Sequence, residues 1–232
     1  MTGKKRYILI GLCLCIMTMG CMNLKQPAYE LSYYTLEYLP LEGSALPPLP
    51  VVLQVAPFGV APAYDTHRIV YRDAPFERNT YVYHRWRTHP GNLVSHRLRQ
   101  DLMNSGLFTA VLTTDNNLPC DYTLTGTVDE FFEWKEARSS RAVLSISVTL
   151  VGTDSDRMED SIRFHNAYRI KESFARKDPP ALVEAMSRAM ARLSKKILTD
   201  LHHYMAHTHE RKDSNTTGSL SENTRASDEE RF

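Results

Sequence analysis

The sequence predicts an α+β domain in which two helices pack on one face of a mostly antiparallel mixed sheet, with an added hairpin rich in Arg, Tyr and Trp. Three successive segments between Tyr122 and Phe174 alternate apolar and polar residues, which indicates an antiparallel meander with one wet face. Two segments, after Pro90 and after Asp178, place apolar residues three and four apart, as amphipathic helices do. We expect these helices to cover the apolar face of the sheet.

The first 20 residues have the features of a bacterial secretory signal. A basic patch at residues 4–6 precedes fourteen uncharged residues at 7–20. A helix of that length rises about 21 Å, less than the roughly 30 Å hydrocarbon core, so a stable membrane span is the weaker interpretation. The Gly20–Cys21 junction resembles a lipobox, at which the cysteine is lipidated and becomes the first residue after cleavage. The sequence therefore predicts a signal peptide at 1–20 and lipidation of Cys21.

Two residues beside Cys21 bear on anchoring. Thr18 stands where lipoboxes usually carry Leu, so a plain cleaved signal stays open as an alternative. Met22 would be the second residue of the mature chain, in place of the Asp that commonly retains such lipoproteins in the inner membrane. By this resemblance the protein is expected to be lipid-anchored at the periplasmic face of the outer membrane.

The composition of the mature chain restricts its partners. Cleavage would remove three of the 28 basic residues and none of the 27 acidic ones. This slightly acidic balance argues against a nucleic-acid partner, which would favour a basic surplus. Cys120 would be the one remaining free cysteine, and no nucleophile motif surrounds it.

The domain is predicted to span residues 31–207, after a tether at 21–30. Leu31–Pro40 is expected to form a first strand and 41–50 a loop, because the loop segment is rich in Gly and Pro. A second short strand begins at Val51 and is ended by Pro57.

The next stretch interleaves arginines with aromatic residues. Two β-prone pieces, Arg68–Tyr71 and Thr80–Arg85, flank a polar turn at 73–79. Such interleaving can indicate a nucleic-acid surface, a cation–π lattice, or a hairpin whose arginines shield an edge strand. We interpret it as a structural hairpin with a protein-contact role, with a purely structural hairpin and a ligand site as alternatives.

The remaining elements follow from their boundary residues. Pro90 suits the first position of a helix and Gly106 its carboxyl-terminal stop, and a strand starts at Phe108. After the meander, Asp178 is a plausible cap for a helix whose apolar stripe covers about 25 residues. The polar segment 208–232 is expected to be a disordered tail, because it has too few apolar residues to pack.

No motif for catalysis or for a cofactor is present. The chain contains no glycine-rich nucleotide loop, Walker A sequence or GxSxG elbow. His203 and His207 lie one helical turn apart, but a solvated helix end accounts for them better than a metal site. We therefore expect a protein without a cofactor or metal and without enzyme activity.

The order of several motifs resembles the ABC-type transport auxiliary lipoproteins. The matching stretches include "YYTL", "RIVYR", the tryptophan of "RW", "LVSHRLRQDLMNSGLF" and "AMSRAMARLSKKI", over roughly Leu31 to Met205. The weak lipobox and the long polar tail depart from the family pattern.

The resemblance implies an auxiliary periplasmic subunit that docks and assembles with other proteins. Its expected partners are an MCE-domain protein and an ABC transporter complex that moves lipids or other hydrophobic compounds, with a homo-oligomeric ring as a further expectation. The interface candidates are Arg68, Tyr71, Tyr83, Arg85 and Trp86, since Trp, Tyr and Arg dominate interface hot spots. The alternative is a structural or envelope-assembly lipoprotein without a transport role.

Overall fold

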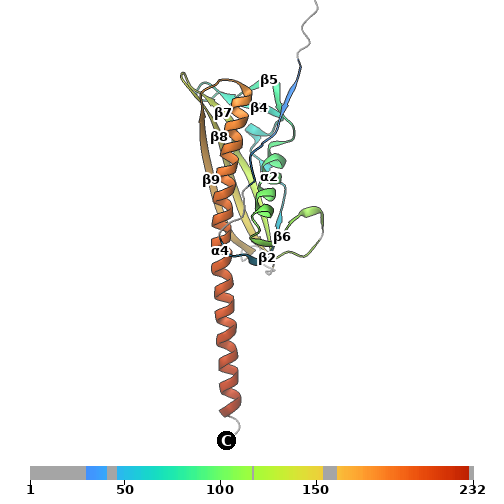
Figure 1. Cartoon of the computed structure of the whole chain (residues 1–232), viewed down its shortest axis with the longest axis vertical. Coiled ribbons are helices and arrows are strands. Elements are labelled where there is room, and N and C mark those ends of the chain that lie inside the picture. The colour runs from blue at the N-terminus through green and yellow to red at the C-terminus, as the bar shows by residue number, and fades with distance from the viewer. Residues whose placement is uncertain (1–29, 41–45, 117, 154–160, 230–232) are drawn as a thin grey trace, which may run out of the picture. The chain divides into compact units, whose positions relative to one another are not determined.

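The computed structural model describes residues 30–40, 46–116, 118–153 and 161–229, and for residues 116 and 209–229 it describes the backbone only. The predicted signal peptide, Cys21 and the tether up to residue 29 lie outside these residues. The described chain is an α+β unit, as the sequence predicts, with one nine-stranded mixed sheet and two long helices (Figure 1).

The longest strand, β7 (Tyr122–Lys135), organises the sheet, because both of its edges are paired. One edge pairs in parallel with three short strands in chain order: β2 (Leu49–Val55), β3 (Gly59–Val60) and β4 (Arg68–Arg72). The other edge pairs antiparallel with β8 (Ser140–Gly152), which pairs antiparallel with β9 (Ile162–Phe174). The predicted meander is thus present, and the short strands add the parallel part of the mixed sheet.

Three further short strands complete the two ends of the sheet. β6 (Phe108–Thr113) lies parallel to β2. β5 (Asn79–Trp86) lies antiparallel to β4 and forms the predicted hairpin with it, and β1 (Ser32–Tyr34) lies parallel to β5. The first strand is much shorter than its Tyr- and Leu-rich sequence predicts. The rest of that segment packs on the helices instead: Leu36 is buried, and the backbone N–H of Glu37 donates to Ser187 Oγ at 3.1 Å.

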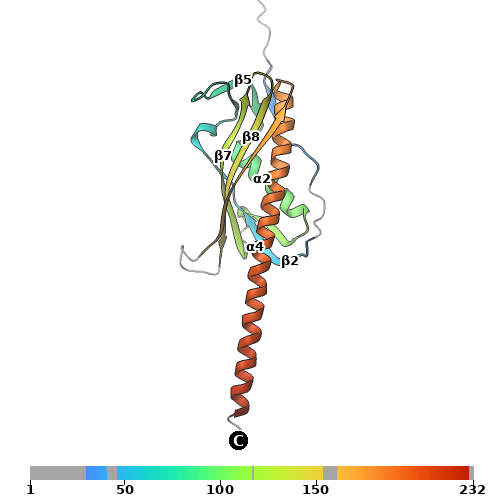
Figure 2. The same ribbon diagram turned by 90° about the vertical axis from the view of Figure 1, so that its left-hand side faces the viewer.

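Both helices lie on the same side of the sheet, as predicted (Figure 2). α2 (Pro90–Asn104) packs against β6 and β7, and it is followed by Gly106 with φ of +67°, the left-handed conformation that suits glycine. α4 (Pro179–Glu229) packs against β8 and β9. Its start is capped as predicted, because Asp178 Oδ1 accepts a hydrogen bond from the Ala181 backbone N–H at 2.8 Å.

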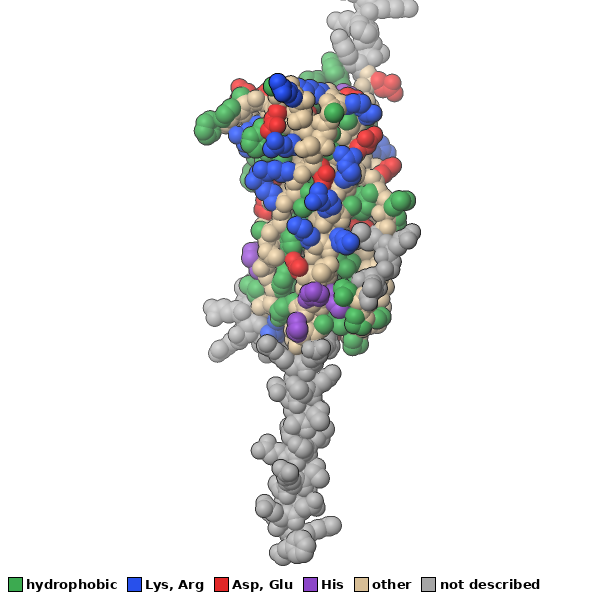
Figure 3. Space-filling view, turned by 60° about the vertical axis from the view of Figure 1, so that its left-hand side comes forward, with side chains coloured by type: hydrophobic (Ala, Val, Ile, Leu, Met, Phe, Trp, Pro, Cys, Tyr) green, Lys and Arg blue, Asp and Glu red, His purple; other side chains and the backbone are tan. Residues whose placement is uncertain are grey.

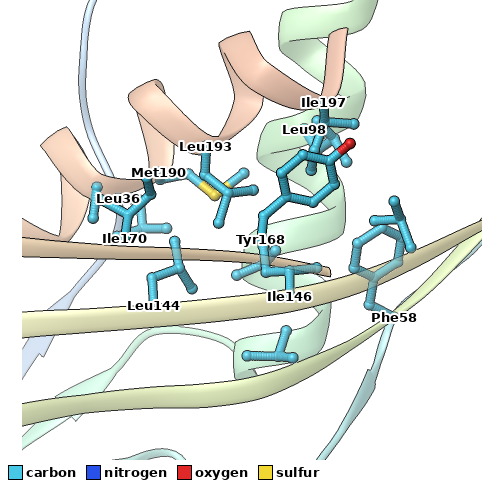
Figure 4. Packing of buried hydrophobic residues seen from close by; sticks show 14 of the residues in the cluster. Leu36, Phe58, Leu98, Leu144, Ile146, Tyr168, Ile170, Met190, Leu193 and Ile197 are labelled. Carbon is cyan, nitrogen blue, oxygen red and sulfur yellow. The ribbon is translucent and has the colours of Figure 1, made fainter. Parts of the chain in front are cut away.

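The core lies between the helices and the sheet. The predicted stripe of α4 is buried from Leu182 to Leu201, with Tyr204 partly buried at its end. Figure 4 shows side chains from four elements meeting there: Met190, Leu193 and Ile197 of α4, Leu98 of α2, Leu144 and Ile146 of β8, and Tyr168 and Ile170 of β9. Ile162, the first residue of β9, is exposed and lies outside this core, although the alternation of apolar residues along the strand predicts that it faces inward.

The end of α4 differs from the prediction. The sequence placed the end of the helix near His207, before a disordered tail at 208–232, but α4 continues to Glu229. A polar composition removes packing contacts without removing the hydrogen bonds within a helix, and the segment 208–229 contains no proline to interrupt them. The side chains of residues 209–229 lie outside the description, so their lack of packing stays a prediction.

Among the described residues, no helix is long and apolar enough to cross a membrane.

The start of α2 approaches the backbone between β2 and β3 closely. A Cβ at Gly91 would overlap the carbonyl oxygen of Phe58, which is backbone and cannot move aside cheaply. Gly59 differs, since the nearest atom to a Cβ there would be Thr127 Oγ1 at 3.6 Å, an ordinary contact. Glycine at position 91 therefore lets α2 sit against the sheet.

We expect Gly91→Ala to lower the free energy of unfolding by about 1–3 kcal/mol, as overpacked sites do. Urea unfolding followed by circular dichroism would measure this change. Gly59→Ala is the matched control and should be close to neutral. Equal stability of the two variants would contradict the close approach of α2.

Trp86, an interface candidate in the sequence, lies in the core. It is 2% exposed, and its ring centroid is 4.8 Å from that of Phe131 on β7. Its position at the end of β5, beside Tyr34 of β1, directs the ring inward. A partner cannot reach this ring without displacing β5, so the expectation of direct contact is corrected to a supporting role.

Trp86→Ala should therefore lower the free energy of unfolding by about 3–5 kcal/mol, the usual cost of truncating a large buried aromatic residue. Phe76→Ala, at a fully exposed residue, should change it by no more than about 0.5 kcal/mol. Thermal and urea unfolding would compare both variants with the parent. A Trp86→Ala variant as stable as the parent would show that the ring is not part of the core.

Candidate functional site

The β4–β5 hairpin carries all five interface candidates, and the structure separates them by exposure. Arg68 is exposed and pairs across the hairpin with Arg85, which is half-buried. Tyr83 is 38% exposed, whereas Tyr71 is half-buried and Trp86 is buried. The surface open to a partner therefore consists of Arg68, Tyr83 and Arg85, which we call the hairpin surface.

The two arginines of the hairpin surface lack partners among the described residues. The Arg68 guanidinium makes no hydrogen bond, ion pair or ring contact there, and Arg85 Nε is buried without a hydrogen-bond partner. Their strand positions place two like charges opposite each other, which is unfavourable in isolation. An acceptor from outside the described chain, such as a carboxylate or a phosphate, would satisfy both groups.

A cluster around Lys135 holds the hairpin to β7. Lys135 Nζ lies 3.4 Å from the ring centroid of Tyr71 and 4.5 Å from that of Tyr81, and the two rings are 4.9 Å apart. The Tyr81 hydroxyl donates to Glu133 Oε2 at 2.8 Å, and Glu133 is buried. Tyr71 is therefore part of a cation–π cluster within the sheet rather than a free contact residue.

The pKa of the Tyr81 hydroxyl is raised well above its ordinary value of 10, first by burial and then by the Glu133 carboxylate that accepts its hydrogen bond. The hydroxyl consequently remains a protonated donor even in alkaline solution where a free tyrosine would ionise. This bond satisfies a carboxylate that would be costly to bury without a partner.

A second group of cation–π contacts lies on Trp134 and Phe132 of β7. The Arg72 guanidinium is 4.7 Å and the Lys171 ammonium 5.7 Å from the Trp134 centroid. The Arg78 guanidinium lies 5.3 Å from the Phe132 centroid. The lattice that was one alternative interpretation of the sequence is thus present, and it uses arginines that were not interface candidates.

Phe76, at the turn of the hairpin, is not among the residues that the sequence predicted for the contact surface. Its side chain is 100% exposed, and its φ of +66° is unusual for any residue other than glycine. Val82, on the following strand, is 58% exposed. In the sequence, the presence of a large apolar residue inside a polar turn indicates such an exposed side chain.

A hollow of about 390 Å³ lies beside β1 and the first turns of α4. Its lining is mixed: Tyr33, Tyr34 and Val183 alternate with Thr35, Ser187 and the acidic residues Glu37 and Glu184. An acyl chain in this hollow would remove the Glu37 and Glu184 carboxylates from water without giving them a partner, so the hollow is a poor match for it.

The described residues contain no group of three or more His, Cys, Asp or Glu side chains arranged to hold a metal ion. Cys120 is a half-buried free thiol whose Sγ lies 3.7 Å from Thr123 Oγ1. His203 is exposed on α4, as a solvated helix residue would be. The arrangement of the hairpin suits recognition of another molecule by contact.

Comparison with solved structures identifies the fold. A crystal structure of a Xanthomonas campestris protein of the DUF330 family superposes with a TM-score of 0.69 at 17% identity, covering 77% of this chain and 99% of that one. A second crystal structure, of an uncharacterized protein, gives a TM-score of 0.57 at 16% identity, covering 74% of this chain and 99% of that one. Among curated proteins, none matches the chain.

Comparison with protein families gives a match over residues 34–198, which includes every described strand except the start of β1 and reaches well into α4. The matching family is described as the ABC-type transport auxiliary lipoprotein component. The resemblance noted in the sequence is therefore confirmed, and the chain belongs to the family of ABC-type transport auxiliary lipoproteins.

Proposed function

We propose that the protein is a lipid-anchored auxiliary subunit of an ABC transport system of the MCE type, held by Cys21 at the periplasmic face of the outer membrane. It docks the assembly that moves lipids or other hydrophobic compounds between membranes. Membership of the auxiliary lipoprotein family is the observation that carries this proposal. The Gly20–Cys21 junction and Met22 support the anchor and its destination.

The hairpin surface is the proposed contact with an MCE-domain protein or with further copies of the chain in a ring. Arg68 and Arg85 favour this role because neither has a partner among the described residues: the Arg68 guanidinium is exposed, and Arg85 Nε is buried without a hydrogen bond. Tyr83 adds an exposed aromatic ring between them and the turn. Arginine and tyrosine are enriched at interface hot spots, where they combine apolar area with hydrogen bonding.

Docking suits the architecture better than carriage of a lipid. The space between the helices and the sheet is filled by fully buried side chains. The hollow beside β1 has two carboxylates, Glu37 and Glu184, in its lining, and an acyl chain there would remove them from water. The transported compound is therefore assigned to the partner subunits, and the role of this chain is to position them.

Anchoring through Cys21 has a direct test. Mass spectrometry of the mature protein should find an amino-terminal Cys21 peptide carrying acyl chains, and separated membranes should show it in the outer-membrane fraction. Cys21→Ala is the control, and it should yield neither the acylated peptide nor the membrane association. An unmodified peptide that begins at Met22, or an uncleaved signal, would refute the anchor.

The docking role is tested by Tyr83→Ala and Arg85→Ala. Truncating hot-spot residues costs about 2 kcal/mol or more, so each variant should bind the MCE-domain protein, or its own copies, roughly 30-fold more weakly. Affinity measurements with the purified MCE subunit and light scattering would measure the loss, while circular dichroism checks folding.

Met103→Ala is the matched control, because Met103 is an exposed apolar residue on α2. It should bind like the parent. If the hairpin variants fold and also bind like the parent, the contact lies elsewhere. If the parent binds no MCE-domain protein at all, the alternative of an envelope-assembly lipoprotein gains support.

A further inference from the structure

We propose that the turn of the β4–β5 hairpin inserts Phe76 into the surface of the bilayer that carries the lipid anchor. The turn comprises residues 73–78. The surface that it contacts is a lipid bilayer that includes anionic headgroups. This inference rests on the anchoring through Cys21 proposed above and adds a second, non-covalent contact with the same membrane.

The first observation is the state of Phe76 itself. Its ring is fully exposed and its backbone is left-handed. Exposure of the ring to water and the left-handed backbone each cost free energy, and both costs fall on this one residue. Figure 3 shows hydrophobic side chains that protrude at the upper left of the molecule, next to Lys and Arg side chains. An apolar residue held out on a turn is placed to enter an interface rather than to support the fold.

The second observation is the direction in which the chain reaches the anchor. β1 runs parallel to β5, with Ser32 beside His84. The residues that precede β1 therefore leave it toward the same end of the sheet from which β5 starts, and β5 starts at the turn. The chain therefore enters β1 at the end of the sheet that carries Phe76.

The length of the tether is compatible with this contact. Nine residues, 22–30, lie between Cys21 and Leu31, the first residue of the folded unit, so ten Cα–Cα steps join the two. Fully extended, they span at most about 33–36 Å. This length limits the distance between the start of β1 and a lipidated Cys21 to about 36 Å, which leaves the turn within reach of the membrane.

The third observation is the charge at this end. The β7–β8 turn and the connection from β9 to α4 lie at the same end as the hairpin turn, because Arg72 pairs with Trp134, and Ser140 pairs with both Lys135 and Phe174. The segments 72–78, 135–139 and 175–178 together contain six basic and four acidic residues. An exposed aromatic residue at an end of the sheet with an excess of two basic residues suits an interfacial contact with anionic lipids.

Lipid-borne quenching tests the insertion. An environment-sensitive fluorophore is attached to Phe76→Cys in the full lipoprotein, in a Cys120→Ser background, and the protein is reconstituted in phosphatidylethanolamine–phosphatidylglycerol vesicles. Leu118→Cys is the matched control, because Leu118 is 53% exposed and precedes β7 at the opposite end of the sheet. Vesicle flotation first separates the anchored protein from free protein.

In the floated fraction, lipids brominated in their acyl chains should remove most of the fluorescence at position 76 and leave the Leu118→Cys probe unchanged. Vesicles of phosphatidylcholine alone should give weaker quenching at position 76, because the cationic contacts lose their anionic partners. A floated protein with an unquenched probe at position 76 would overturn the insertion while leaving the anchor intact. A protein that does not float would refute the anchor and this inference together. Shielding of the position 76 probe from soluble quenchers, without lipid quenching, would assign the turn to a protein partner instead.

Discussion

Hydrogen bonding on both edges of β7 is the constraint on which the rest of the structure depends. A strand of this length can pair with several shorter strands along one edge, and β2, β3 and β4 do so in succession. Pro57 and Pro62 interrupt this run, because proline donates no hydrogen bond to a ladder. The hairpin is therefore located by β7 as well, since β4 is its first strand.

The aromatic and cationic residues of the hairpin serve two separate purposes. Tyr71, Tyr81 and Lys135 join the hairpin to β7 through ring and cation contacts, and Trp86 packs into the core behind them. Arg68 and Arg85 have no such role among the described residues. A rigid support behind a few unsatisfied donors is the arrangement that a contact surface needs, since little ordering is left to occur on binding.

The segment between β1 and β2 connects the sheet with both helices. The Tyr38 hydroxyl donates to Asp101 Oδ2 of α2 at 2.5 Å, while Glu37 bonds Ser187 of α4. Burial, and then the Asp101 carboxylate, raise the pKa of Tyr38 above its ordinary range, so the hydroxyl remains a donor even in alkaline solution where a free tyrosine would ionise. The segment that follows β1 is thus joined by hydrogen bonds to both helices.

The sequence by itself determined the fold class, the meander, both helix starts and the family, because these depend on local periodicity, caps and motif order. It also located the hairpin, but only the tertiary structure assigned its residues. Burial of Trp86, the Tyr71 cluster and exposure of Phe76 depend on which strands meet β7, and no local pattern specifies that pairing. The same reason explains the parallel strands, since residues of β2, β3 and β4 become neighbours of β7 only when the chain closes over long sequence separations.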